Sequence, residues 1–509
     1  MNLKLMLEET ARQHGSKAAI ILGEQRLSYA ELDATSNKVA NALIKLGVEK
    51  GDRVAILLPN SLEFVATYFG VIKTGAIAVP LNTRYKVDEL SSLFDNSQPK
   101  VLLTESPFLE PLVPALPRFK SIEHIIDVRS RDDIQFLSYR EILTTSSAQR
   151  VEVELEPEDI AHIAYTSGPS GRPKGVMLSH QSLTTEVAVA ANGCQQTDKD
   201  VAMLIALPLH HVLGLVVVLL NSISKGSTVV MLPGLSISSL LEIIEREKVT
   251  IFMGVPYIFI LAVNMAEEGV KYDLSSLRLC VSGGSAIPND IIKRFKKHYG
   301  VSLLQLWGLT EATALVTLQL LDGTGKLGSA GKVLPGWELK VVDDSGKELP
   351  LNQPGELIVR GPIMKGYYNN PHATAETMKD GWLYTGDIGR VDEDGDVFIS
   401  GRKKEMIIVK GQNIYPSDIE DVLYTNPKVA EAAVVGIPDE LRGEIVRAVI
   451  SLKKGKVATE QEIRQFCLER MANYKVPKQI IFIDSLPKTA TGKIRKQELR
   501  DYLNLASSL

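Results

Sequence analysis

The sequence predicts an α/β protein: a large N-terminal domain of α/β sheets with flanking helices, followed by a small α+β domain. The first observation is the length of 509 residues with 45% hydrophobic side chains, which is more than one hydrophobic core organises. The second is the repeated order of apolar strand, helix and apolar strand, which is typical of parallel sheets. The third is a change of pattern after residue 383, where short strands and turns replace these units.

The first strand–helix–strand unit lies in residues 52–82. Val54–Leu58 is a continuous apolar run, the apolar residues of 62–72 recur at helical spacing, and Ile77–Leu81 is a second apolar run. Continuous runs joined by a helix predict parallel strands that are buried on both faces.

Two similar units follow in the middle of the chain. A helix at Leu240–Glu247 precedes an apolar run at Thr250–Gly254, and an apolar run at Leu277–Val281 precedes a helix at Ile287–Tyr299. In the last helix the apolar residues form one stripe, and the lysines lie outside it. We therefore expect α/β order over most of the chain.

The C-terminal part has the pattern of a separate α+β domain. Asp394-Gly395 predicts a tight turn between two short strands. Beyond residue 404 we expect three strands and one helix, at Val434–Ile437, Val446–Leu452, Ile480–Ile483 and Thr459–Met471. We place the boundary between residues 400 and 401, which gives domains 1–400 and 401–509, the second of an ordinary size.

Composition narrows the class of protein. The net charge of −4 and pI near 6.1 give no overall attraction to nucleic acid or anionic lipid. Cys194, Cys280 and Cys467 lack the spacing of a metal site or a disulfide framework, which fits a reducing compartment. No signal peptide is evident in residues 1–11, and the most apolar run, Val212–Leu220, is far shorter than the ~20 residues of a membrane span. We expect a cytoplasmic protein without a transmembrane segment, and a homodimer is compatible with the sequence.

A glycine-rich segment, YTSGPSGRPKG at Tyr165–Gly175, directly follows the apolar run Ile160–Ala164. Its glycines let backbone N–H groups converge on an anion, its hydroxyls add donors, and Lys174 adds positive charge. Such a segment taken alone is more often an ordinary surface turn. The spacing also differs from that of a P-loop, because Pro173 separates the basic pair and Gly175 follows Lys174. A P-loop ATPase is therefore disfavoured.

This segment resembles the phosphate loop of the AMP-forming adenylating enzymes, which include acyl-CoA synthetases, luciferase-like proteins and peptide-synthetase adenylation domains. Further motifs follow in the order of that family and extend the resemblance over nearly the whole chain. They are LPLHHVLGL at Leu207–Leu215, LWGLTEAT at Leu306–Thr313, YTGD at Tyr384–Asp387, GRKKEMI at Gly401–Ile407 and PKTATGKIRK at Pro487–Lys496.

The resemblance implies a nucleotide site with defined roles. Thr310 would donate to the α-phosphate, and Glu311 would hold Mg²⁺ through oxygen while pyrophosphate departs. Asp387, expected on a tight turn, would accept the ribose hydroxyls, and Arg402 would reach the ribose or a phosphate. Trp307 would lie beside the adenine or the acyl pocket, where the family usually has tyrosine. The full set for ATP or AMP is Thr166, Ser167, Gly168, Ser170, Gly171, Lys174, Trp307, Gly308, Thr310, Asp387, Arg402 and Lys493.

Lys493 is the residue predicted to act in the adenylation step. It follows a glycine in TATGKIRK, which suggests a mobile loop facing solvent. An ammonium group there would offset the repulsion between a carboxylate and a triphosphate. By the resemblance, the C-terminal domain then rotates about a hinge at Lys404, and Lys410 and Gly411 line the tunnel for the CoA arm.

The acyl pocket is predicted from fewer residues. His211 matches the histidine that lies near the carboxylate in the family, and Gly283, Gly284 and Ser285 form a wall of small residues. Close backbone packing explains paired glycines equally well. Pro169 departs from the family pattern, which has a hydroxyl residue there, and we expect a modest weakening of the ATP contacts.

The predicted activity is that of an ATP-dependent acid–thiol ligase with ATP, Mg²⁺ and CoA. A carboxylate and ATP give acyl-AMP and pyrophosphate, and CoA then gives acyl-CoA and AMP. A medium- or long-chain fatty acid is favoured by the texture of the sequence, including PGELIVRGPIMKGYYNNP at Pro354–Pro371. The alternatives are an aryl acid of the benzoate or cinnamate type, a carrier protein loaded in trans, and a catalytically weak nucleotide-binding homologue.

Overall fold

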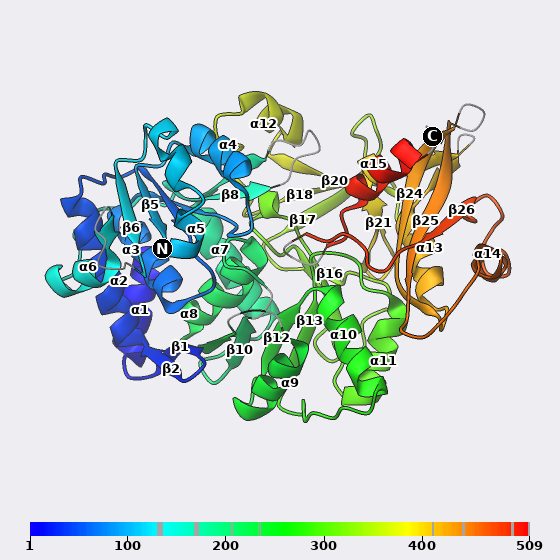
Figure 1. Ribbon diagram of the computed structural model, residues 1–509, viewed down its shortest axis with the longest axis horizontal. Helices are drawn as coiled ribbons and strands as arrows, with labels where there is room; N and C mark the ends of the chain where they lie inside the picture. Colours follow the sequence, from blue (N-terminus) through cyan, green and yellow to red (C-terminus); the bar gives the residue numbers. More distant parts are fainter. Residues whose placement is uncertain are drawn as a thin grey trace.

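The chain folds into a large and a small lobe (Figure 1). The computed structural model describes residues 1–129, 136–166, 173–204, 207–232, 234, 236–409, 412–439, 443–489 and 493–506. Within these residues the strands form four sheets, three in the large lobe and one in the small lobe. The α/β class with a smaller α+β C-terminal part is confirmed.

The first sheet carries the start of the predicted glycine-rich loop at its edge. Its spatial order is β7 (Leu137–Ser138), β6 (His124–Asp127), β5 (Val101–Thr104), β3 (Arg53–Leu57), β4 (Ile77–Pro80), β8 (Ile160–Thr166) and β9 (Lys174–Ser179). The strands β3 and β4 are parallel, as predicted, and β5 pairs parallel with β3 on its other side. By contrast, β8 and β9 are antiparallel, and their pairing extends to Thr166 and Lys174.

The second sheet brings several strand ends to one edge. Its order is β16 (Lys332–Val333), β15 (Thr317–Leu318), β14 (Leu303–Trp307), β13 (Leu279–Ser282), β12 (Ile251–Gly254), β10 (Val201–Leu204), β11 (Thr228–Met231), β1 (Ala18–Leu22) and β2 (Gln25–Ser28). Since β12, β13 and β14 are parallel, their last residues, Gly254, Ser282 and Trp307, lie at the same end of the sheet. In open α/β sheets, ligands bind at the carboxyl ends of parallel strands.

The third sheet leads into the small lobe, which contains the fourth. The third has β17 (Glu338–Val342), β18 (Gly355–Arg360), β20 (Trp382–Val391) and β19 (Met378–Lys379), with β21 (Val397–Arg402) beside β20. The fourth has β23 (Gln412–Ile414), β22 (Ile407–Val409), β25 (Gly443–Leu452) and β24 (Val429–Asp439), with β26 (Gln479–Phe482) beside β25. Three of these strands contain or overlap the predicted C-terminal strands.

Helices cover the sheets of both lobes. In the large lobe they are α1 (Leu3–His14), α2 (Tyr29–Lys45), α3 (Leu62–Thr74), α4 (Val87–Ser97), α5 (Ser106–Leu109), η1 (Val113–Arg118), α6 (Tyr139–Thr145), α7 (His180–Gly193), η2 (Leu213–Leu220), α8 (Asn221–Lys225), α9 (Ile237–Arg246), α10 (Pro256–Glu267), α11 (Asn289–Tyr299), η3 (Thr310–Ala312) and α12 (Pro371–Thr377). In the remainder of the described chain they are η4 (Lys403–Glu405), α13 (Pro416–Tyr424), α14 (Glu460–Leu468) and α15 (Lys496–Ala506).

The helix ends follow from local sequence. In α3, the side chain of Ser61 accepts the Phe64 N–H, and Gly75 ends the helix with a φ of 76°, a conformation that glycine adopts without strain. The helix predicted to reach Met471 stops at Leu468. The prediction was three residues too long: the Arg470 N–H bonds to the carbonyl of Cys467, three residues back, where an α-helix would bond four residues back.

The two lobes have separate hydrophobic cores. The clusters of the large lobe run in sequence from Leu3 to Val397, and those of the small lobe from Ile407 to Leu503. In β24, Val434 faces one small-lobe cluster while Val435 faces the other, because successive side chains of a strand point to opposite faces. The small sheet is therefore covered on both sides.

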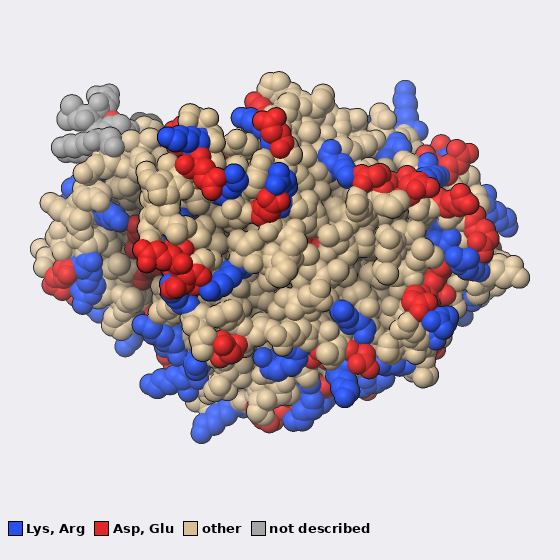
Figure 2. Space-filling model, turned by 180° about the vertical axis from the view of Figure 1, so that it is seen from behind, with Lys and Arg blue, Asp and Glu red and all other residues tan. Residues whose placement is uncertain are grey.

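Two further features concern surface and environment. On the face shown in Figure 2, acidic and basic side chains lie interspersed around the rim, and uncharged residues occupy a broad central area. Among the residues that the structure describes, no helix has both the length and the apolar character needed to cross a bilayer. All three cysteines are buried and unpaired.

Candidate active site

The predicted site residues that the structure describes gather where the lobes meet. Thr166 and Lys174 end β8 and β9, and the Thr166 hydroxyl donates to the Lys174 carbonyl at 3.5 Å. Other predicted residues lie outside the described part of the chain; they are Ser167, Gly168, Pro169, Ser170 and Gly171 of the glycine-rich loop, and Lys410 and Gly411 of the tunnel.

A tight loop after β14 carries the predicted phosphate and metal ligands. Gly308 has no room for a side chain, because a Cβ there would lie 1.8 Å from the Ala314 carbonyl oxygen. Thr310, which is buried, then begins η3. Within the same loop Thr313 adopts a φ of 59°, which is unusual for a β-branched residue. Backbone strain of this kind recurs at functional sites.

The buried side chain of Glu186 supports the loop that follows β14 through a hydrogen bond at the end of the loop. Glu186 in α7 accepts the Leu315 N–H at 2.6 Å and the Trp337 indole N–H at 3.2 Å. Burial raises the pKa of Glu186 well above its ordinary value, although both hydrogen bonds act against the shift. Sequence analysis did not single out Glu186, since a glutamate in a helix gives no sign of being buried.

One corner of the site is built around Tyr367. Its hydroxyl donates to the Glu311 carboxylate at 2.9 Å, and the Lys174 ammonium lies 4.8 Å from the centroid of its ring. Tyr367 is only 6% exposed, and burial together with the neighbouring Glu311 raises the pKa of its hydroxyl. We call Lys174, Glu311 and Tyr367 the Tyr367 corner. Sequence analysis missed Tyr367, although the GYYNN segment was part of the family resemblance.

A second corner is built around Asp387. One of its oxygens lies 2.6 Å from Arg402 Nε, and the other accepts the Trp307 indole N–H at 2.9 Å. The expected place on a tight turn was wrong: Asp387 lies within β20, paired with Arg402 in β21, and is 4% exposed. Burial raises its pKa, and the Arg402 guanidinium opposes the shift. We call Asp387, Arg402, Trp307 and Lys493 the Asp387 corner.

The expectation that Lys493 faces solvent was also wrong. A Cβ added to Gly284 would lie 3.5 Å from Lys493 Cε, so the side chain extends from the small lobe into the large one. Burial lowers the pKa of Lys493 and Arg402 lowers it further, while Asp387 and Glu311 raise it. The backbone is held in place by Thr489, whose N–H donates to the Lys493 carbonyl at 2.7 Å and whose hydroxyl accepts the Lys493 N–H at 3.1 Å.

Further contacts join the lobes around this lysine. The Lys488 ammonium lies 2.7 Å from Glu431 in its own lobe and 4.5 Å from the ring centroid of Tyr257 in α10. The predicted hinge residue Lys404 lies in the middle of the short helix η4, next to the end of β21. The lobes therefore meet through a short connection and through contacts on the loop that carries Lys493.

The predicted acyl side of the site starts at His211. Burial, together with the charges of Lys493 and His210, lowers the pKa of His211 to about 3, so the ring is neutral at pH 7. Its Nδ1 accepts the Leu213 N–H at 3.3 Å, which leaves the ring proton on Nε2 as a donor. A neutral imidazole of this kind orients an oxygen atom rather than removing a proton.

The predicted wall of small residues has three different surroundings. Gly283 is packed against Leu306, whose Cδ1 would be 2.5 Å from an added Cβ. Gly284 has a φ of 84° and lies beside Lys493 and Val255. Ser285 is exposed. Close packing therefore accounts for the first glycine, and the second lies at the site.

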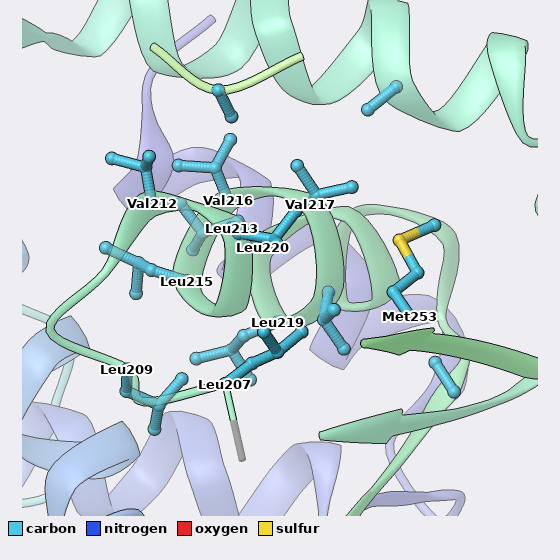
Figure 3. Close-up of a cluster of buried hydrophobic side chains, with 14 of the residues drawn as sticks. Leu207, Leu209, Val212, Leu213, Leu215, Val216, Val217, Leu219, Leu220 and Met253 are labelled. Carbon is cyan, nitrogen blue, oxygen red and sulfur yellow. The ribbon is translucent and has the colours of Figure 1, made fainter. Parts of the chain in front are cut away.

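An apolar π-helix follows His211. This helix, η2, is buried at every position, and Figure 3 shows its side chains pointing into apolar surroundings all around its axis, with Met253 of β12 among the neighbours. Gly214 allows the close approach of the preceding turn, since a Cβ there would lie 2.8 Å from the carbonyl oxygens of Leu207 and Pro208. π-Helices are rare and occur frequently at functional sites.

Glu311 is the one predicted metal ligand. Within the described ranges, no group of three or more His, Cys, Asp or Glu side chains is arranged to hold a metal ion. Mg²⁺ is commonly held by one or two carboxylates together with substrate phosphates. A single oriented carboxylate at the phosphate side of a nucleotide site fits that pattern.

Family models match both lobes of the chain. The model described as AMP-binding enzyme matches residues 7–368, and the model described as AMP-binding enzyme C-terminal domain matches residues 418–493. The chain is 35% identical to a long-chain-fatty-acid–CoA ligase of Bacillus subtilis, over 98% of this chain and 94% of the relative. It is 36% identical to 4-coumarate-CoA ligase 1 of Narcissus pseudonarcissus, over 97% and 92% respectively.

Solved structures give the same picture. The anthranilate CoA ligase AuaEII in complex with anthranoyl-AMP is 31% identical, with a TM-score of 0.94 over 100% of this chain and 98% of that one. MatB of Rhodopseudomonas palustris is 31% identical over 99% of both chains, and its TM-score is 0.90 for the ATP-bound structure and 0.79 for the apo structure.

Proposed function

Because this chain belongs to the AMP-binding enzyme family and is an adenylate-forming ligase of the acyl- or aryl-CoA kind, we propose that it activates a medium- or long-chain fatty acid with ATP and transfers the acyl group to CoA. The observation that carries this proposal is the position of Lys493. Its side chain extends from the small lobe to Gly284 of the large lobe, where the charges of Asp387, Arg402 and Glu311 act on its pKa. Adenylation needs a cation near the atoms on which negative charge develops, which supports the proposal.

In the adenylation step the two corners would hold opposite ends of ATP. Asp387 accepts the ribose hydroxyls, Thr310 donates to the α-phosphate, and Lys174 with the glycine-rich loop holds the outer phosphates. Glu311 is the residue that would hold Mg²⁺, which neutralises charge on the departing pyrophosphate. The better agreement with ATP-bound than with apo MatB supports this orientation of the lobes.

Lys493 and His211 would act at the reacting atoms. The fatty carboxylate attacks the α-phosphate, pyrophosphate leaves, and negative charge gathers on the oxygens between them. The Lys493 ammonium stabilises that charge, and the Nε2–H of neutral His211 orients the attacking carboxylate. The low pKa of His211 supports this role, since a neutral ring does not have to release a proton first.

Thioester formation would follow a rotation of the small lobe. Lys404 is the proposed hinge, and the rotation withdraws Lys493 and brings Lys410 and Gly411 to the site for the CoA arm. The separate cores of the two lobes support domains 1–400 and 401–509 that move as units.

The surroundings of His211 support a hydrophobic acid. Val212 and the residues of η2 are buried and apolar, as is Val255 beside Gly284. An aryl acid is the second candidate, because 4-coumarate and anthranilate ligases resemble the chain as much as the fatty-acid ligase does.

The test is acid-dependent release of pyrophosphate and AMP by the purified protein with ATP, Mg²⁺ and CoA. Octanoate, palmitate, benzoate and 4-coumarate would be compared, with a carrier protein in place of CoA as a parallel reaction. We expect the highest kcat/KM with a fatty acid and CoA. A preference for the aryl acids would overturn the substrate assignment, and no turnover with any acid would favour a nucleotide-binding homologue.

A further inference from the structure

The hydrogen bond between Trp307 and Asp387 joins two sheets of the large lobe. Trp307 is the last residue of β14 in the second sheet, and Asp387 lies in β20 of the third. The indole N–H donates to one carboxylate oxygen at 2.9 Å, and both side chains are at least nine-tenths buried. A buried indole N–H needs an acceptor in any case; what distinguishes this bond is that its acceptor is Asp387, the residue predicted to bind the ribose.

The two donors to Asp387 differ in where they come from. Arg402 binds the other oxygen at 2.6 Å and lies at the end of β21, directly before η4 and the small lobe. Trp307 lies deep in the large lobe. Neither side chain can accept a hydrogen bond, so together they fix the plane of an acceptor carboxylate. Each oxygen keeps a further lone pair for another donor.

We propose that Trp307 is a positioning residue for nucleotide recognition: its indole N–H holds the Asp387 carboxylate so that the free lone pairs face the ribose hydroxyls. This inference rests on the proposed function. It assigns Trp307 to the ribose instead of to adenine stacking or to the acyl pocket. Because Trp307 does not belong to the segment that joins the lobes, it keeps Asp387 oriented when the small lobe moves.

The chain contains a matched control. Trp337 is also buried, and its indole N–H donates to a buried carboxylate, that of Glu186, at 3.2 Å. Trp337→Phe removes the same kind of hydrogen bond from a carboxylate that is given no ribose contact. Trp307→Phe keeps an aromatic ring and removes the N–H at the site.

The experiment is calorimetric titration of the full chain and its variants with AMP, 2′-deoxy-AMP and 3′-deoxy-AMP. We expect the wild type to prefer AMP over each deoxy nucleotide by about 10-fold, the usual scale for a hydrogen bond to a charged group. Trp307→Phe should weaken AMP binding by about 10-fold and change the deoxy nucleotides little, so that the preference nearly disappears. Trp337→Phe should keep the wild-type preference.

Two outcomes would overturn the inference. One is an unchanged preference in Trp307→Phe, and the other is an equal loss for all three nucleotides, which would indicate a contact with the base. If Trp307→Phe does not fold, Trp307→Leu provides the same test, since leucine also has no side-chain donor for Asp387. If the wild type binds AMP more tightly than the deoxy nucleotides, the proposed function stands whatever the variants do. If the wild type binds no AMP, both the proposed function and the inference about Trp307 are overturned.

Discussion

The Tyr367 corner and the Asp387 corner are built in different ways. Lys174, Glu311 and Tyr367 all belong to the large lobe and contact one another there. The Asp387 corner is completed by Lys493, which comes from the small lobe. One corner is therefore organised before the small lobe arrives, and the other is complete only in this orientation of the lobes. In the proposed two-step reaction, this difference would allow the corner assigned to the phosphates to stay fixed while the corner that contains Lys493 is rebuilt.

The largest effect is expected from a substitution in the Asp387 corner, which Lys493 of the small lobe completes. Lys493→Ala should slow acyl-AMP formation by roughly 10²- to 10³-fold, because one preorganised cation near the developing charge is lost. Thioester formation from supplied acyl-AMP should change little. Single-turnover measurements of the two half-reactions would check both rates.

The control for this variant is a neighbouring lysine of the small lobe. Lys496 lies 2.7 Å from Glu420 within that lobe, so Lys496→Ala should change either rate by less than about twofold. Acyl-AMP formation at the wild-type rate in Lys493→Ala would contradict the role given to the ammonium group.

The next largest effect is expected from a substitution in the Tyr367 corner, whose residues all belong to the large lobe. Tyr367→Phe removes the hydroxyl that orients Glu311 and keeps the ring that faces Lys174. Loss of a group that orients a metal ligand typically costs about 10- to 100-fold in metal affinity, and we expect an effect near the lower limit. The measurement is the Mg²⁺ concentration needed for half-maximal pyrophosphate release.

Tyr165→Phe is the matched control for that measurement, because the Tyr165 hydroxyl donates to Asn96 at 2.6 Å and not to a site residue. Both variants lose one phenol hydroxyl from the large lobe. An equal Mg²⁺ requirement in Tyr367→Phe and in the wild type would show that Glu311 needs no such support.

The third prediction concerns the pH dependence of activity, which should depend on Lys493 of the Asp387 corner. Burial and Arg402 hold the pKa of Lys493 below the ordinary lysine value of 10.5, so the free enzyme loses its ammonium at a lower pH than an exposed lysine would. The kcat/KM for ATP should therefore fall about 10-fold for each unit above that pKa. Bound triphosphate favours the charged form, so the alkaline limb of kcat should lie at higher pH.

Lys493→Arg tests the origin of this limb, since a guanidinium stays protonated throughout the accessible range. The variant should be slower and should lack the limb. If the alkaline limb persists in Lys493→Arg at the same pH, another group is responsible for it.

Short-range sequence patterns predicted the α/β fold class. They did not predict the side-chain contacts at the site that join residues far apart in the sequence. The unit β3–α3–β4 follows from apolar periodicity within about 30 residues, and its ends are off by one residue at most on the strands. The Tyr367–Glu311 bond spans 56 residues and the Trp307–Asp387 bond spans 80. No short-range pattern records such pairs. The expected position of Lys493 in solvent was wrong, because its burial depends on how the lobes meet.

The smallest expected effect concerns the support behind the Tyr367 corner. Glu186 has a pKa raised well above 4.5 by burial, which means that the folded state binds its proton more tightly than the unfolded chain does. That contribution to stability is present below the unfolded value and is lost as pH rises through the folded value. Glu186→Gln has no such titration, so the wild type should lose thermal stability relative to the variant as pH rises above the ordinary glutamate value of 4.5.

We expect the unfolding midpoint of the wild type to fall relative to that of Glu186→Gln as pH rises, and thermal unfolding of both proteins at matched pH values measures the difference. The Mg²⁺ requirement of Glu186→Gln should stay within about twofold of the wild type, because the amide oxygen still accepts the Leu315 N–H that Glu186 now holds at 2.6 Å. A parallel pH dependence of the two midpoints would show that no proton is held at this position. A large rise in the Mg²⁺ requirement would instead make the Tyr367 corner depend on a buried charge, and the corner would then be less rigid than its contacts within one lobe indicate.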